Sequence, residues 1–155
     1  MLAMLVARIV LGVVWIVAGL IKLPDPAGSV RAVRAFQLLP EAVVPAVGYG
    51  LPLLEVALGL FLVLGVSVRI GAIVSAALLG AFLIGVSSAW ARGLSIDCGC
   101  FGGGGAVASD QTRYGTEILR DLALLMVAAA LIRWPASRFA LVPHPRALEP
   151  TPTQG

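Results

Sequence analysis

The two cysteines of the chain, Cys98 and Cys100, are the residues best suited to carry chemistry, because only Gly99 separates them. Two residues of extended chain span about 6.6–7.2 Å, at or beyond the outer edge of the Cα separations found in disulfides, roughly 4.4–6.8 Å. A bridge therefore needs a bend at Gly99, and glycine bends most freely. The ring it closes constrains the unfolded chain very little, whereas a strained, exposed disulfide is labile. The spacing favours redox exchange over stabilisation.

Two other interpretations of this motif stay open. A zinc site needs about four ligands, whereas Asp97, Cys98 and Cys100 offer three, and the single histidine, His144, is expected on the opposite membrane face. The cysteines could instead be inert, because thiol reactivity depends on surroundings that a sequence does not reveal. The glycines at 102–105 lack the Lys-Ser/Thr of a phosphate loop and are expected to form a hinge.

A second candidate cluster consists of charges inside apolar segments. A charge at mid-bilayer costs about 2.5–3.5 kcal/mol on insertion scales, so each one needs a partner. Glu55 lies about a dozen residues into an apolar run, and a helix starting at Pro45 would place it roughly 15 Å deep at 1.5 Å per residue. We expect it to meet Lys22 or Arg120, with Asp121 nearby. Such pairs either stabilise a thiolate or move its proton, or they only fix the helix register.

The elements that must position these groups are set by composition. Of 155 residues, 59% are apolar and 12% charged, and the mean hydropathy is +1.00, whereas soluble domains carry about 25% charged residues. A soluble enzyme and a disordered chain are therefore excluded as leading interpretations. The net charge of +3 does not indicate nucleic-acid binding, because the bases are scattered and no aromatic residues alternate with them.

The apolar runs predict an all-α fold, a four-helix transmembrane bundle. A spanning helix needs about 20 apolar residues, and the expected spans are about 2–21, 43–67, 70–90 and 116–134. Between the first two, a short interfacial helix is expected, with Ser29 as N-cap, Pro40 as stop, and an apolar face at i, i+3, i+4 and i+7. That face consists of Ala32, Ala35, Phe36 and Leu39. The glycine-rich CGC loop joins spans three and four, the membrane domain covers 1–134, and the proline-rich tail at 135–155 is expected to be flexible.

The first apolar segment is expected to be a retained span, because its end, AGLIKLPDP, lacks a small-x-small cleavage site. The positive-inside rule does not decide the orientation. An internal N-terminus divides the bases five against five: Arg8, Arg69, Arg133, Arg138 and Arg146 inside, and Lys22, Arg31, Arg34, Arg92 and Arg113 outside. The short N-terminus favours this orientation, which places the CGC loop outside the cytoplasm.

Four segments together resemble the MauE/DoxX group of four-helix membrane proteins: AGLIKLPDP, LPLLEVALGLFLVLG, DCGCFGG and RDLALL. DCGCFG in particular is similar to the MauE branch, associated with methylamine utilisation, and the resemblance covers roughly residues 5–133. It implies that Cys98 and Cys100 are a redox pair and that Lys22, Glu55, Arg120 and Asp121 occupy the polar motif positions. It also implies a role in disulfide formation in extracytoplasmic proteins, with a thioredoxin-like partner supplying a second dithiol.

We therefore expect a bacterial multi-pass membrane protein that exchanges electrons with a thioredoxin-like protein through its Cys-Gly-Cys pair, acting as a thiol–disulfide oxidoreductase. The alternative is a non-catalytic scaffold or assembly partner of a redox or biosynthetic complex; a solute transporter would rest on the intramembrane charges alone. Neither a nucleic-acid partner nor a metal is expected. A quinone is considered as the electron acceptor, although no motif indicates one. The sequence does not predict the oligomeric state.

Overall fold

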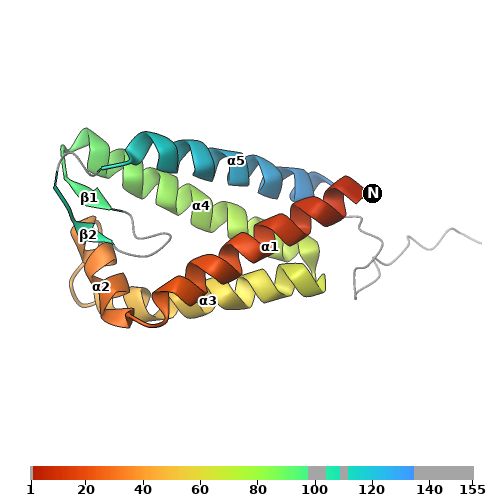
Figure 1. Ribbon diagram of the computed structural model, residues 1–155, viewed down its shortest axis with the longest axis horizontal. Coiled ribbons are helices and arrows are strands. Elements are labelled where there is room, and N and C mark those ends of the chain that lie inside the picture. The colour runs from red at the N-terminus through yellow and green to blue at the C-terminus, as the bar shows by residue number, and fades with distance from the viewer. Residues whose placement is uncertain (1, 98–103, 109–111, 135–155) are drawn as a thin grey trace, which may run out of the picture.

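The computed structural model describes residues 2–97, 104–108 and 112–134. Four long helices run along the molecule: α1 (Leu2–Lys22), α3 (Val44–Leu64), α4 (Val68–Ala91) and α5 (Tyr114–Arg133). The short helix α2 (Pro26–Ala35) and a hairpin of β1 (Ile96–Asp97) and β2 (Gly105–Ala106) lie together at one end (Figure 1). Helix α1 packs mainly against α3, and α4 mainly against α5. Both cysteines and the proline-rich tail lie outside the described residues.

Three of the helices, α1, α3 and α4, are long and apolar enough to cross a membrane. The stripe of α1 that faces away from the other helices is itself apolar, with exposed valines at positions 6, 10, 13 and 17, as expected for a surface in contact with lipid. Helix α5 has 20 residues, but it carries Glu117, Arg120 and Asp121 in its first half and does not qualify by the same criterion. The sequence prediction of apolar spans is thus confirmed for three helices.

The core of the bundle is apolar and draws on all four long helices. Its buried members include Leu11 and Trp15 of α1, Leu62 of α3, Leu79 of α4 and Leu131 of α5. Since these side chains come from elements far apart in the sequence, their packing sets how the helices are rotated toward one another. That rotation decides which polar groups of the helices can meet inside the bundle.

Glycines allow α1 and α3 to approach closely. A Cβ atom at Gly59 would lie 2.5 Å from the carbonyl oxygen of Gly12 and 2.8 Å from the backbone nitrogen of Ile16. At Gly19 it would lie 2.7 Å from the carbonyl oxygen of Pro52. Small residues at contacts between membrane helices permit this kind of backbone approach. The contact carries Lys22 and Glu55 into register, because they lie on these same two helices.

We expect the substitution Gly59→Val to lower the stability of the bundle by about 1–3 kcal/mol or more, the range for overpacked interiors. The added side chain would collide with backbone atoms of α1, which cannot rotate away. Gly50→Val, in the same helix, is the matched control, because a Cβ at Gly50 would have no neighbour within 4 Å. Thermal unfolding in detergent should separate the two variants, and equal melting temperatures would contradict the tight α1–α3 contact.

The short helix forms where the sequence predicts it, but its ends differ from the expectation. The N-cap is Asp25, not Ser29: the Asp25 side chain accepts a hydrogen bond from the backbone N–H of Gly28 at 2.9 Å. An Asp preceding a proline at the first helical position is a strong start signal, and it places Ser29 inside the helix. The helix ends at Ala35, before Pro40, because Gln37 adopts a positive φ of 53°.

The expectation of a purely helical chain missed the hairpin. Ile96 pairs with Ala106 and Asp97 with Gly105 in antiparallel register. Gly104 and Gly105 have φ angles of 94° and 108°, which L side chains rarely adopt. Gly105, the last glycine of the run expected to form a hinge, is thus part of a paired strand. Strands of two residues carry no alternating pattern that a sequence analysis could detect.

Candidate functional site

Lys22 and Glu55 form a buried ion pair between the end of α1 and the middle of α3. The Lys22 ammonium nitrogen lies 2.6 Å from one carboxylate oxygen of Glu55 and 2.8 Å from the other. Lys22 is 8% exposed and Glu55 is fully buried. A cation in the last turn of α1 also interacts favourably with the helix dipole. Of the two partners that the sequence analysis considered for Glu55, the structure selects Lys22 for direct contact.

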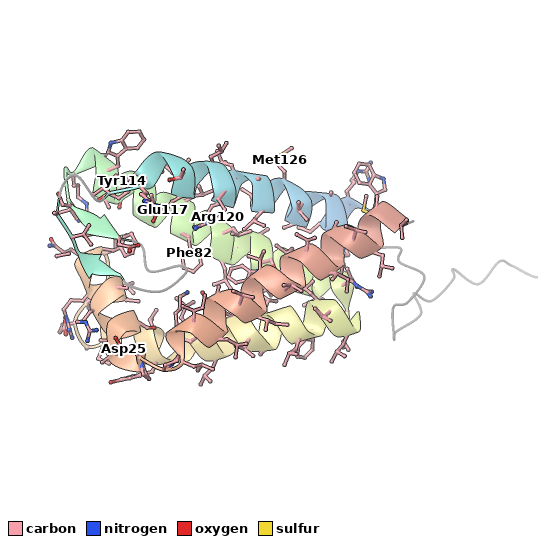
Figure 2. All side chains as sticks on the ribbon, in the orientation of Figure 1. Asp25, Phe82, Tyr114, Glu117, Arg120 and Met126 are labelled. Carbon is pink, nitrogen blue, oxygen red and sulfur yellow. The ribbon has the colours of Figure 1, made fainter. Side chains whose placement is uncertain are left out.

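Phe82 of α4 and Trp15 of α1 surround this pair, and the sequence analysis missed both. The Lys22 nitrogen lies 5.9 Å from the centre of the Phe82 ring, within cation–π range. In Figure 2, Phe82 points from α4 toward the interior of the bundle, and Phe82 and Arg120 line the same small cavity there. The indole of Trp15 stacks at a tilt on Phe82 and donates a hydrogen bond to Ser75 at 3.0 Å. The signal in the sequence that could have pointed to this part of the site is the presence of a serine and a tryptophan within apolar spans.

Arg120 and Asp121, at the start of α5, form a second ion pair with each other. A guanidinium nitrogen of Arg120 lies 2.8 Å from Oδ1 of Asp121, and Nε lies 2.9 Å from the same oxygen. Asp121 is 2% exposed, and its Oδ2 has no hydrogen-bond partner among the described residues. Since buried carboxylate oxygens are usually hydrogen-bonded, this oxygen is suited to bind a water or a proton.

A small cavity connects the two pairs. It has a volume of about 20 Å³, room for about one water molecule, and Glu55, Arg120 and Asp121 line it together with Trp15 and Phe82. All four long helices contribute to its wall. The structure therefore brings Lys22, Glu55, Arg120 and Asp121 into one polar cluster in an otherwise apolar interior, as the sequence analysis expected for the charges within the spans.

The hairpin is attached to this end of the bundle by Tyr114, the first residue of α5. The Tyr114 hydroxyl accepts a hydrogen bond from the backbone N–H of Ile96 at 3.0 Å and donates one to the carbonyl oxygen of Leu94. Its ring stacks on Trp90 and is buried. One side chain thus positions the strand that leads into residue 98, where the Cys-Gly-Cys motif begins.

Replacing Tyr114 with phenylalanine is expected to loosen the hairpin without unfolding the bundle. The ring can still stack on Trp90, but the buried N–H of Ile96 loses its acceptor, which costs about 1–3 kcal/mol locally. Amide hydrogen exchange of a peptide covering residues 94–97 should therefore speed up by tenfold or more, since 1.4 kcal/mol corresponds to a factor of about ten. Tyr49→Phe is the control, because Tyr49 is more than half exposed. Unchanged exchange would show that the hydroxyl does not hold the strand.

The ligands for a metal are not assembled in the described part of the chain, where no three His, Cys, Asp or Glu side chains form a group. This finding does not bear on Cys98 and Cys100, which lie outside the described residues. The expected redox pair therefore stays a prediction. The structure does describe the residues that flank the pair: Asp97 and Gly105, on either side of residues 98–104, are paired with each other.

Comparison with known families gives a match over most of the chain. The model of the family described as methylamine utilisation protein MauE matches residues 1–134. This range contains all five helices, the hairpin and both cysteines, and it ends where the proline-rich tail begins. Neither the comparison with curated proteins nor the one with solved structures gives a significant match.

Proposed function

Because the chain belongs to the MauE family over residues 1–134, we propose that it is a membrane thiol–disulfide redox protein that exchanges electrons through Cys98 and Cys100 with a thioredoxin-like partner. The observation that supports this most is the polar cluster of Lys22, Glu55, Arg120 and Asp121 at the end of the bundle that also carries the hairpin. Charged side chains inside a membrane are costly and rare, and those that are present usually serve a function.

The proposed reaction is a two-step exchange. One thiolate of the pair attacks a sulfur of the partner's disulfide, which forms a mixed disulfide and releases one partner thiol. The second cysteine then attacks the mixed disulfide, closes the Cys98–Cys100 bridge and releases the second partner thiol. The protein loses two electrons and the partner gains them. Run in reverse, the same steps oxidise the partner and so support disulfide formation in its clients.

The proposed topology has α5 as a fourth span. Helix α5 is long enough to cross, since 20 residues at 1.5 Å each extend about 30 Å. Two of the charges in its first half, Arg120 and the buried Asp121, line the interior cavity. Four spans put both ends of the described chain on one face and the hairpin on the other, which we propose is the extracytoplasmic face.

The test of the function is the double variant Cys98→Ser/Cys100→Ser in membranes that contain the thioredoxin-like partner. We expect oxidation of the partner to be lost while complex formation with it stays unchanged. Full partner oxidation in the double variant would overturn the redox proposal. If instead complex formation were lost with the cysteines, the scaffold interpretation would gain support, because the loop would then act as a docking site.

The orientation has its own test. Intact cells are treated with a membrane-impermeant maleimide, with and without prior reduction, and the shift of Cys98 and Cys100 is followed on a gel. Labelling after reduction supports an external, closed disulfide, and labelling without reduction an external dithiol. Labelling that requires cell lysis would place the pair inside and refute the extracytoplasmic proposal.

A further inference from the structure

A second, larger cavity lies beneath α2, separate from the small one between the two ion pairs. Its volume is about 280 Å³, just below the range of about 300–1,000 Å³ typical of ligand pockets. Its wall is almost entirely apolar and comes from α2, α3, α4, the segment that follows α2 and the end of α1. An engineered apolar cavity of about 150 Å³ is large enough to bind benzene, so this cavity can hold a substituted ring.

Two polar groups break the apolar wall. Ser29 is 7% exposed, and its hydroxyl has no hydrogen-bond partner among the described residues. Lys22 lines the cavity as well, and its ammonium has three N–H donors, of which Glu55 accepts two. Since buried polar groups are normally satisfied, the pair of donors indicates a ligand whose oxygen atoms accept hydrogen bonds.

The remaining wall fits a flat, apolar molecule with a tail. The ring of Phe36 lines the cavity from the end of α2, and the ring of Phe82 lines it from α4. Leu38 and Leu39 also line it, and they are 50% and 43% exposed, so they mark its mouth. In a membrane protein an apolar mouth of this kind lets a hydrocarbon tail extend into lipid while a ring stays inside.

The cavity also lies close to the hairpin whose strands flank the proposed redox loop. Helix α2 contacts both strands of the hairpin, and its residues Ser29 and Ala32 line the cavity. One short helix thus separates the cavity from the strands that flank residues 98–104. In the direction that oxidises the partner, the Cys98–Cys100 pair becomes a dithiol and needs an electron acceptor. A membrane-soluble acceptor could reach this site from the lipid.

We infer that this cavity binds the ring of a lipid-soluble quinone, with Ser29 and Lys22 donating hydrogen bonds to its carbonyl oxygens. The inference rests on the proposed function for the reaction: two thiols give up two electrons and two protons as their S–S bond forms, and the quinone takes up both and becomes the quinol. Binding itself depends only on the cavity.

The experiment measures binding of decylubiquinone to the full chain in nanodiscs, by ligand-induced thermal stabilisation and by mapping the crosslinks of an azidoquinone. Ser29→Ala should weaken binding about threefold to tenfold, the effect of one lost hydrogen bond. Ala32→Phe should abolish binding by filling the cavity, since Ala32 is buried in its wall. Ser88→Ala is the control, because the Ser88 hydroxyl bonds to Gly85 within α4 and does not line the cavity.

The outcomes keep the two proposals apart. The variant Cys98→Ser/Cys100→Ser should still bind the quinone, although it cannot reduce it. Ala32→Phe should still exchange thiols with the partner in a single turnover but should not transfer electrons to the quinone. Binding that neither Ser29→Ala nor Ala32→Phe weakens, crosslinks outside the cavity, or equal stabilisation by decylbenzene, which lacks carbonyl oxygens, would overturn the quinone site. Each of these results would leave the partner exchange standing.

Discussion

Replacing either Lys22 or Glu55 with methionine is expected to lower the free energy of unfolding by about 3–5 kcal/mol, the cost of leaving one charge of a buried pair without its partner. The two side chains are almost completely buried and bonded at 2.6 and 2.8 Å. The double variant Lys22→Met/Glu55→Met should recover most of this loss, because no unpaired charge remains and the methionines fill similar volume. Thermal unfolding of the four proteins in detergent completes the double-mutant cycle.

The exposed pair of Arg34 and Glu41 is the matched control for this cycle. Both side chains are at least half exposed, and the hydrogen bond from Arg34 lowers the pKa of the Glu41 carboxyl. Exposed pairs contribute little to stability, so Arg34→Met and Glu41→Met should change the melting temperature far less. If Lys22→Met and Glu55→Met were as mild as these, the interior pair would not be the anchor that the structure indicates.

The same cycle separates a structural from a functional role of the pair. A double variant that folds as well as the wild type but exchanges thiols with the partner more slowly would assign the pair to the reaction. A double variant with full exchange would leave it a structural ion pair that sets the register of α1 and α3. The interaction energy of the cycle reports on stability alone, so both readouts are needed.

Single cysteine variants are expected to trap the partner. The partner used is a variant of a thioredoxin-like protein that retains only one of its two active-site cysteines. This cysteine is activated as a mixed disulfide with a small aromatic thiol, and the partner is then added to each variant of our protein. The attacking cysteine of our protein displaces the small thiol and forms a mixed disulfide, which persists when the second cysteine is absent. We expect one variant, Cys98→Ser or Cys100→Ser, to convert most of the protein to this complex on a non-reducing gel.

The other proteins in this experiment serve as controls. The wild type should show only background complex, because its second cysteine resolves the mixed disulfide and releases the partner. The double serine variant should show none. The single variant that traps the partner still contains the attacking cysteine, so the experiment identifies which of the two cysteines attacks. Absence of a complex with both single variants would contradict thiol exchange with this class of partner.

The membrane segments could be predicted closely from the sequence, because the thickness of the bilayer sets the length of an apolar run. The runs expected at 2–21 and 70–90 are α1, Leu2–Lys22, and α4, Val68–Ala91. The run expected at 43–67 is somewhat shorter as α3, because Gly65 ends the helix in a left-handed conformation with φ 76°. The helix expected at 116–134 is also present as α5, although its charges leave it outside the apolar criterion for a span.

The sequence also determined which polar residues would need partners, since each charge in an apolar run must be neutralised or bonded. It could not determine the pairing. That Glu55 meets Lys22 rather than Arg120 depends on the close approach of α1 and α3 at Gly12 and Gly59, a contact between residues 47 positions apart along the chain. Only the packed bundle fixes such a register.

The tertiary structure alone decided the elements around the proposed redox loop. The hydroxyl of Tyr114 holds a strand that is 18 residues away in sequence, and the cavity beneath α2 is formed by residues of four helices and one connecting segment. Local patterns report how a segment faces water or lipid, whereas a cavity is space left between surfaces. Its size and lining follow from how those surfaces pack, and no single segment of sequence contains that information.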